Sequence, residues 1–175
     1  MIPRALKSLV TSLTDRGPSK RHGPERPGQA GQQPAVDRIT IVGLMDGADE
    51  DGRLLVDIGS RSGWNVVFVD TSSDAKAALD QARAPVVLCD RELLGMGWRN
   101  AVERLAGPPN QACVILLSET VDTYFWNEVV RSGGHDVLPK PLREEGVVRA
   151  VRLARTYWNS LARKGVTSGR IVATS

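Results

Sequence analysis

Five short runs of aliphatic and β-branched residues alternate with longer amphipathic segments between residues 38 and 161. This alternation constrains the fold more than any other feature of the chain. It predicts strands over Arg38–Leu44, Val66–Asp70, Val86–Asp90, Val114–Ser118 and Asp136–Leu138. It predicts helices over Glu50–Ser62, Ser73–Ala82, Gly97–Leu105, Val121–Ser132 and Arg143–Leu161. Because strands that alternate with helices pair in parallel through right-handed crossovers, we expect an α/β fold with a parallel sheet and helices on both faces.

The net charge divides the chain into an acidic middle and two basic ends. The whole chain carries +3, with a pI near 9.1, which taken alone suggests a polyanionic partner. Residues 37–159 hold 14 basic and 18 acidic side chains, whereas residues 1–36 carry +4 and residues 160–175 carry +3. The excess of positive charge therefore belongs to the ends, and nucleic acid and membranes are disfavoured as partners of the middle.

Composition separates three segments. Residues 15–36 combine Pro, Gly, Gln and charge with almost nothing to bury, so we expect residues 1–36 to be a disordered basic extension. Apolar residues at helical spacing in 2–13 fit a short amphipathic helix, and an arbitrary extension is the favoured alternative. The predicted domain spans 37–161, and 162–175 are expected to form a flexible tail.

The cysteines and the absence of export signals predict a cytoplasmic protein. Cys89 and Cys113 lie in apolar runs without the spacing of a metal site or a disulfide scaffold, so they are interpreted as reduced, buried thiols. We find no apolar stretch long enough to span a bilayer and no secretory cleavage pattern.

Chemistry-bearing side chains follow the ends of the predicted strands. They are Asp46 with the acids Asp49, Glu50 and Asp51 after the first strand, Asp90 at the third, Ser118 at the fourth and Lys140 after the fifth. Ligands of open parallel sheets bind at the carboxyl ends of the strands. Carboxylates, a hydroxyl and an ammonium at one edge form a set suited to phosphate chemistry with Mg²⁺.

Three stretches resemble the receiver domain of bacterial two-component response regulators. They are VVLCDRELLGMGW around Asp90, ILLSETVD around Ser118 and GGHDVLPKPL around Lys140. The resemblance covers about 120 residues, and the separation of Ser118 and Lys140 is the receiver spacing. It implies a flavodoxin-like, doubly wound five-stranded sheet in the order 2-1-3-4-5.

The resemblance also implies a role for each site residue. Asp90 would accept a phosphoryl group from a phosphohistidine of a sensor kinase or phosphotransfer protein, and Asp46 and Asp90 would hold Mg²⁺. Ser118 would bond a phosphoryl oxygen, and Lys140 would pair with Asp90 before transfer and with the phosphoryl group afterwards. The Lys140–Pro141 bond is expected to be cis.

The chain departs from the receiver pattern at three positions. Gly47 stands where a second metal-binding acid is usual, so the Mg²⁺ site should be weakened unless Asp49, Glu50 or Asp51 substitutes. The favoured alternative for those three acids is a stabilising cluster in a first helical turn. Leu94 replaces a proline, and Val137 replaces the aromatic residue that swings inward on activation.

Two functions follow from these residues. The leading hypothesis is a stand-alone receiver, since the 14 residues after Leu161 are too few for an output domain. Such a domain is not an enzyme beyond hydrolysis of its own acyl phosphate. Its output would pass through a protein contact on the helix at 121–132 and the strand at 136–138, where at least one of Tyr124, Phe125 and Trp126 must be exposed. The alternative is a pseudo-receiver that docks proteins without phosphorylation.

Overall fold

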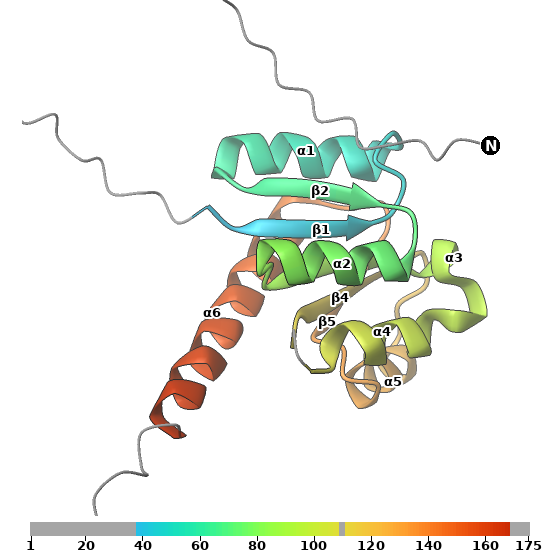
Figure 1. The fold of residues 1–175 in the computed structure, drawn as a ribbon. Coiled ribbons are helices and arrows are strands. Elements are labelled where there is room, and N and C mark those ends of the chain that lie inside the picture. Colours follow the sequence, from blue (N-terminus) through green and yellow to red (C-terminus); the bar gives the residue numbers. More distant parts are fainter. Residues whose placement is uncertain (1–37, 109–110, 169–175) are drawn as a thin grey trace, which may run out of the picture. The chain divides into compact units, whose positions relative to one another are not determined.

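A single five-stranded sheet organises the computed structural model, which describes residues 38–108 and 111–168 (Figure 1). The strands are β1 (Thr40–Leu44), β2 (Asn65–Val69), β3 (Val86–Asp90), β4 (Cys113–Ser118) and β5 (Asp136–Pro139). All neighbours pair in parallel, in the order β2-β1-β3-β4-β5. The predicted doubly wound order is confirmed.

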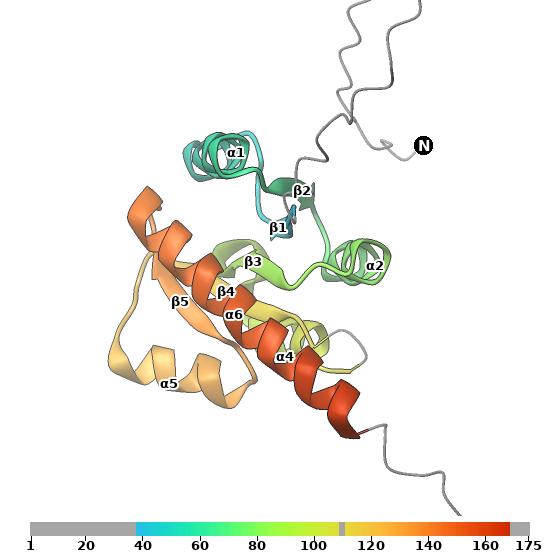
Figure 2. The same cartoon turned by 90° about the vertical axis from the view of Figure 1, so that its left-hand side faces the viewer.

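Helices cover both faces of the sheet. They are α1 (Glu50–Ser62), α2 (Ser72–Ala82), α3 (Arg91–Leu94), the 3₁₀ turn η1 (Gly95–Gly97), α4 (Trp98–Ala106), α5 (Thr123–Arg131) and α6 (Glu144–Ser168). Buried residues of α1 and α6 share one apolar cluster with the sheet, whereas those of α2, α4 and α5 share another. Figure 2 shows α1 and α2 on opposite sides of β1.

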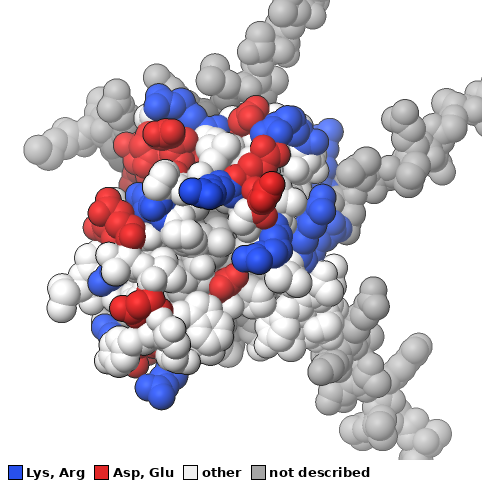
Figure 3. Space-filling model, turned by 180° about the vertical axis from the view of Figure 1, so that it is seen from behind, with Lys and Arg blue, Asp and Glu red and all other residues white. Residues whose placement is uncertain are grey.

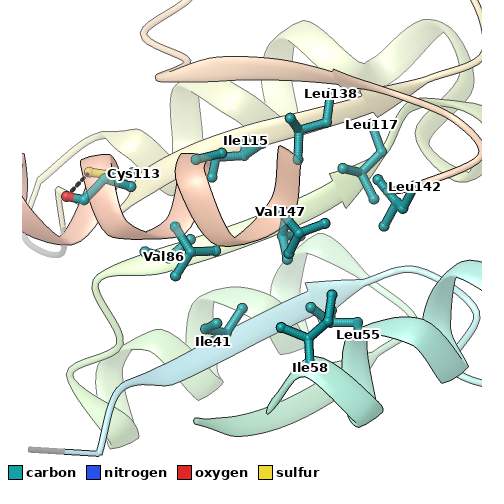
Figure 4. Close-up of a cluster of buried hydrophobic side chains, with 14 of the residues drawn as sticks. Ile41, Leu55, Ile58, Val86, Cys113, Ile115, Leu117, Leu138, Leu142 and Val147 are labelled. Carbon is teal, nitrogen blue, oxygen red and sulfur yellow. Dashed lines mark hydrogen bonds between the residues drawn. The ribbon is translucent and has the colours of Figure 1, made fainter. Parts of the chain in front are cut away.

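Alternation along the strands produces these two clusters. In β3, Val86 and Leu88 face the cluster of α1 and α6, and Val87 and Cys89 face the other. Because successive side chains of a strand point to opposite faces, a strand buried on both faces must be apolar throughout. Figure 4 shows the first cluster, in which Leu55 and Ile58 of α1 lie opposite Val147 of α6.

Both cysteines are free and buried, as predicted. The Cys113 thiol donates to the carbonyl oxygen of Ala154 in α6 at 3.3 Å (Figure 4). Burial raises the pKa of Cys113 to about 11, and burial together with the charge of Asp90 raises the pKa of Cys89 to about 12. Neither thiol is therefore a nucleophile at neutral pH.

The structure moves most of the predicted element ends by one or two residues, and it adds helical structure at two places. The segment after Asp90, left without a helix in the prediction, forms α3 and η1, because the Asp90 side chain caps its first turn by accepting from the Glu92 backbone N–H at 2.9 Å. Strand β2 begins and ends one residue earlier than predicted. Helix α6 ends at Ser168 and not at Leu161, since Ala162, Arg163 and Lys164 favour a helix and no proline interrupts the segment.

Some predictions fall outside the described residues. These are the extension at 1–36, with its amphipathic segment, and the part of the predicted tail at 169–175. None of the helices within 38–108 and 111–168 combines the length and apolarity needed to cross a bilayer. The Lys140–Pro141 bond is cis, as expected.

Candidate functional site

The sheet brings Asp90, Ser118 and Lys140 to one edge. Asp90 is the last residue of β3, Ser118 is the last of β4, and Lys140 directly follows β5. The three strands are neighbours, and the Lys140 backbone N–H donates to the carbonyl oxygen of Ser118 at 2.9 Å. The three predicted strand-end residues therefore lie together at the carboxyl end of the sheet.

Asp90 is a buried carboxylate with both oxygens occupied. Its Oδ2 accepts from Lys140 Nζ at 2.6 Å, its Oδ1 accepts from the Glu92 backbone N–H, and only 6% of the residue is exposed. Burial acts to raise the pKa of Asp90, but the bonds from Lys140 and Glu92 outweigh it and hold the pKa below its ordinary value. Asp90 is thus ionised at neutral pH and accepts hydrogen bonds through both of its oxygens.

Lys140 lies between two carboxylates. Its Nζ is 3.8 Å from Oδ2 of Asp51, in addition to its bond with Asp90. Burial acts to lower the pKa of Lys140, but the hydrogen bond and charge of Asp90, followed by the charges of Asp51 and Asp49, raise it. The ammonium is therefore held charged, and its charge is shared between Asp90 and Asp51.

The structure places Asp49, Glu50 and Asp51 differently, although the sequence left open which of these acids belongs to the site. Asp49 is the N-cap of α1 and accepts from the Gly52 backbone N–H at 2.6 Å, and Glu50 is exposed in the first turn. Asp51 is buried and enters the site, where its Oδ1 accepts from the Leu142 backbone N–H at 2.6 Å. Helix stabilisation explains Asp49, whereas Asp51 is a site residue that points to Lys140.

Ser118 is fully buried and its hydroxyl is occupied locally. The Oγ donates to the carbonyl oxygen of Thr120 at 2.9 Å and accepts from the Thr120 backbone N–H at 3.3 Å. It also accepts from Nη1 of Arg91 at 3.2 Å. In this arrangement Ser118 contacts a neighbouring cation rather than Asp90.

Arg91 is the site residue that sequence reasoning missed. It follows Asp90 directly, and its guanidinium carbon lies 4.5 Å from the ring centroid of Phe125 in α5. Glu92 also lies beside Asp90, to which its backbone N–H donates, and partial burial together with the Asp90 carboxylate raises the pKa of Glu92. The sequence does place an arginine next to the predicted phosphoacceptor. It does not show in which direction the side chain of that arginine points.

A shallow hollow opens beside Lys140. Its lining residues are Asp51, Glu119, Lys140 and Pro141. Asp90 is not among them, whereas Lys140, which bonds Asp90, is. Asp51 and Glu119 make the lining partly acidic, so the entrance is suited to a cation, or to an anion that binds together with a cation.

The metal site predicted at Asp46 and Asp90 has a sparse donor set. Asp46 follows β1, next to β3, and its Oδ1 accepts from the Ala48 backbone N–H at 2.8 Å. Gly47 supplies no side chain, and the described residues contain no group of three or more metal-ligating side chains. Mg²⁺ is commonly held by one or two carboxylates, so the chemistry of Asp46 and Asp90 suits the ion, whereas in this structure both oxygens of Asp90 are bonded to Lys140 and to the Glu92 backbone.

The residues that replace the usual proline and aromatic pack into the protein. Val137 is buried in the cluster that contains Phe125 and Val129, and Leu94 packs against the same cluster at the end of α3. A buried valine cannot swing between an inner and an outer position as a larger ring can.

The predicted docking surface lies on α5 and β5. Tyr124 is 72% exposed and Trp126 41%, whereas Phe125 is buried, which confirms that the three aromatic residues cannot all face the core. Trp126 donates from Nε1 to Asp136 of β5 at 3.3 Å. Figure 3 shows charged side chains of both signs over the upper part of one face of the molecule, and mostly uncharged ones over the lower part.

Solved structures provide the comparison with known proteins. Neither a protein-family model nor a curated protein matches the sequence. A response regulator from Thermotoga maritima is 20% identical, covers 67% of this chain and 97% of its own, and has a TM-score of 0.59. For the chemotaxis protein CheY4 of Vibrio cholerae the values are 15%, 67%, 98% and 0.58.

A third structure names the domain itself. The signal receiver domain of a modulated diguanylate cyclase from Desulfovibrio desulfuricans is 21% identical, covers 69% of this chain and 94% of its own, and has a TM-score of 0.53. Together with the strand order and the position of Asp90, Ser118 and Lys140, these likenesses assign the fold. The described part of the chain has the fold of response regulator receiver domains.

Proposed function

We propose that this chain is a receiver domain of two-component signalling and that Asp90 is its phosphoacceptor. The observation that carries the proposal is the bond of 2.6 Å between Lys140 Nζ and Asp90 Oδ2, at the edge where Ser118 ends the adjacent strand. Hydrogen bonds keep Asp90 ionised, and Lys140 is placed to neutralise charge on a group transferred to it. Positioning and charge neutralisation are the main requirements of phosphoryl transfer.

The reaction is a displacement at phosphorus. An oxygen of Asp90 attacks the phosphorus of a phosphohistidine or an acyl phosphate, the new P–O bond forms, and the bond to the leaving group breaks with its electron pair. Lys140 then pairs with the phosphoryl group, and Ser118 lies at the same edge of the sheet, where the resemblance gives it a part in the binding. Asp46 and Asp90 would hold Mg²⁺ weakly, and the ion would supply further neutralisation of the phosphoryl oxygens.

The partners follow from the same proposal. The donor is a sensor histidine kinase or a phosphotransfer protein, and the output is a protein contact on α5 and β5. The chain acts in the cytoplasm and is a substrate of its kinase rather than an enzyme. Neither nucleic acid nor a membrane is required for this function.

Labelling by acetyl phosphate tests the function. We expect the purified chain with Mg²⁺ to gain one phosphoryl group by intact-mass measurement, and Asp90→Asn to gain none. Asp70→Asn is the matched control, because Asp70 is an exposed carboxylate that directly follows β2 at the same edge of the sheet. Equal labelling of the Asp90 variant, or no labelling of the native chain, would contradict the proposal.

A pseudo-receiver is the second candidate. It is supported by Gly47 at the position of a metal ligand, by the buried Val137 and by the local hydrogen bonds of Ser118. In this case the fold docks a protein without phosphorylation. A titration with Mg²⁺ followed by NMR separates the two, because a pseudo-receiver shows no shifts near Asp46 and Asp90 at millimolar metal.

A further inference from the structure

The hydroxyl of Ser118 is engaged by its own neighbours in this structure. A serine hydroxyl has one hydrogen, which Ser118 donates to the Thr120 carbonyl at 2.9 Å. Its oxygen accepts from Arg91 and from the Thr120 backbone. Binding a phosphoryl oxygen would break the bond to Thr120 and leave that carbonyl without its partner, so Ser118 is better placed to hold Arg91 than to hold the phosphoryl group.

Arg91 has the donors that Ser118 lacks. A guanidinium carries five N–H groups in a planar fork that matches the oxygens of a phosphoryl group. Within the described residues, one of the five has a hydrogen-bond partner, the Oγ of Ser118 at 3.2 Å. Arg91 is also partly exposed and directly follows Asp90 in the chain, and its guanidinium lies at Ser118, the last residue of the strand that pairs with the strand of Asp90.

The negative charge of a phosphoryl group on Asp90 would need a second cation beside Lys140 to neutralise it. Phosphorylation adds about −1.5 to −2 charges to a side chain at neutral pH. Lys140 is shared between Asp90 and Asp51, and Gly47 supplies no carboxylate for a tightly held metal ion. Arg91 brings a permanent positive charge to the same edge, because its guanidinium already contacts Ser118.

Arg91 also contacts the proposed output helix. Its guanidinium carbon lies 4.5 Å from the centroid of Phe125, and Phe125 in turn meets Trp98 edge to face, with ring centroids 5.4 Å apart. Movement of the guanidinium toward Asp90 would remove it from the ring. The position of Arg91 therefore links the state of Asp90 to α5, a link that the buried Val137 cannot provide.

We propose that Arg91 binds the phosphoryl oxygens of phosphorylated Asp90, that Ser118 acts through Arg91 as a positioning residue, and that this binding withdraws the guanidinium from Phe125. The inference rests on the proposed phosphoacceptor role of Asp90. It assigns to Arg91 the direct contact that the sequence assigned to Ser118.

The test is a double-mutant cycle on the rate of labelling by acetyl phosphate. An Asp90 oxygen bonds to phosphorus and acetate leaves with the electron pair of the broken P–O bond, so the rate reports charge neutralisation at the phosphoryl group. We expect Arg91→Met to slow labelling at least tenfold and Ser118→Ala about threefold. The double variant should be no slower than Arg91→Met, because Ser118 acts through the arginine.

Two further variants separate binding from packing. Arg91→Lys keeps the charge but loses the planar fork, so it should recover part of the rate. Arg99→Met is the matched control, since Arg99 lies over the Trp98 ring at the same 4.5 Å but bonds Glu128 of α5 instead of a site residue. It should label within twofold of the native chain. Thermal unfolding of each variant verifies that it is folded.

The indole N–H signal of Trp98 in NMR spectra reports the movement. In the native chain it should shift on phosphorylation as Arg91 leaves Phe125, and in Arg91→Met the phosphorylation-dependent shift should be lost. A double variant as slow as the product of the two single losses, or equal slowing by Arg91→Met and Arg99→Met, overturns the inference and leaves the function intact. No label on the native chain overturns both.

Discussion

Asp51 of α1 and Leu142, which precedes α6, are joined by a hydrogen bond of 2.6 Å from the Leu142 backbone N–H to Asp51 Oδ1. The bond fastens the segment that carries Lys140 to the first helix. The other oxygen of Asp51 faces the Lys140 ammonium at 3.8 Å. One carboxylate thus fixes the backbone beside the lysine and shares its charge.

Substitutions of Asp51 separate these two contributions. Asp51→Ala leaves the buried Leu142 N–H without an acceptor, so we expect a loss of about 2 kcal/mol in the free energy of unfolding. Asp51→Asn keeps a carbonyl oxygen at the same place and should lose less than half as much. Urea denaturation measures both. Equal losses would show that the charge, and not the backbone bond, dominates.

Removing Lys140 should destabilise the protein at neutral pH and not in acid. In Lys140→Met the buried Asp90 carboxylate has no cation, which costs about 3 kcal/mol at pH 7. Because the folded pKa of Asp90 lies below its ordinary value of 3.8, the stability it gains from Lys140 is present above that value and is lost as the pH falls through the folded pKa.

Denaturation of both proteins between pH 3 and pH 7 checks this expectation. The difference between Lys140→Met and the native chain should shrink as the pH falls below 4. Lys76→Met is the control, because the pair of Lys76 with Asp80 is exposed at 3.4 Å and its loss should cost less than about 0.5 kcal/mol. A difference that stays constant with pH would mean that Lys140 stabilises the fold by packing alone.

Much of the fold was predictable because it depends on local patterns. The sequence shows directly which strands are apolar and how long each β–α unit is. The strand order was predicted from the resemblance around Asp90, Ser118 and Lys140. These three residues lie at strand ends, so parallel pairing alone brings them to one edge. Their neighbours at the site required more than pairing.

The contacts that the sequence did not predict depend on side-chain direction. Asp49, Glu50 and Asp51 are adjacent acids whose roles differ: Asp49 is the extended N-cap of α1, and the helix rotates Asp51 by about 100° from Glu50. Only a three-dimensional structure identifies Asp51 as the one that faces Lys140. The direction of Arg91 was likewise unpredictable, since α3 depends on the cap that Asp90 itself provides.

Gly52 should not tolerate a methyl group, although it lies in a helix. A Cβ at this position would come within 2.4 Å of the carbonyl oxygen of Asp46 and 2.7 Å of the Gly47 backbone. Gly52→Ala must therefore displace the loop that carries Asp46, and we expect a loss of about 2 kcal/mol in stability and weaker binding of Mg²⁺.

Gly146 provides the matched control for Gly52. It lies in α6, where an added Cβ would meet only Leu138 at 3.8 Å, an ordinary contact. Gly146→Ala should therefore stabilise the protein by up to about 1 kcal/mol, through helix propensity. Thermal unfolding compares the two variants. If both substitutions stabilise the protein, the loop between β1 and α1 moves to accommodate the methyl group without a loss in the free energy of unfolding.

The alternation of burial along α5 gives the last prediction. Phe125 packs in the core and contacts Trp98 and Arg91, so Phe125→Ala should cost about 3 to 4 kcal/mol. Tyr124 is exposed, and Tyr124→Ala should change stability by less than about 0.5 kcal/mol. Tyr124 and Phe125 are adjacent in α5, so the difference between their losses of stability does not come from their distance to the end of the helix. If Tyr124→Ala is instead as destabilising as Phe125→Ala, α5 is rotated from the orientation described, and the surface proposed for docking would be part of the core.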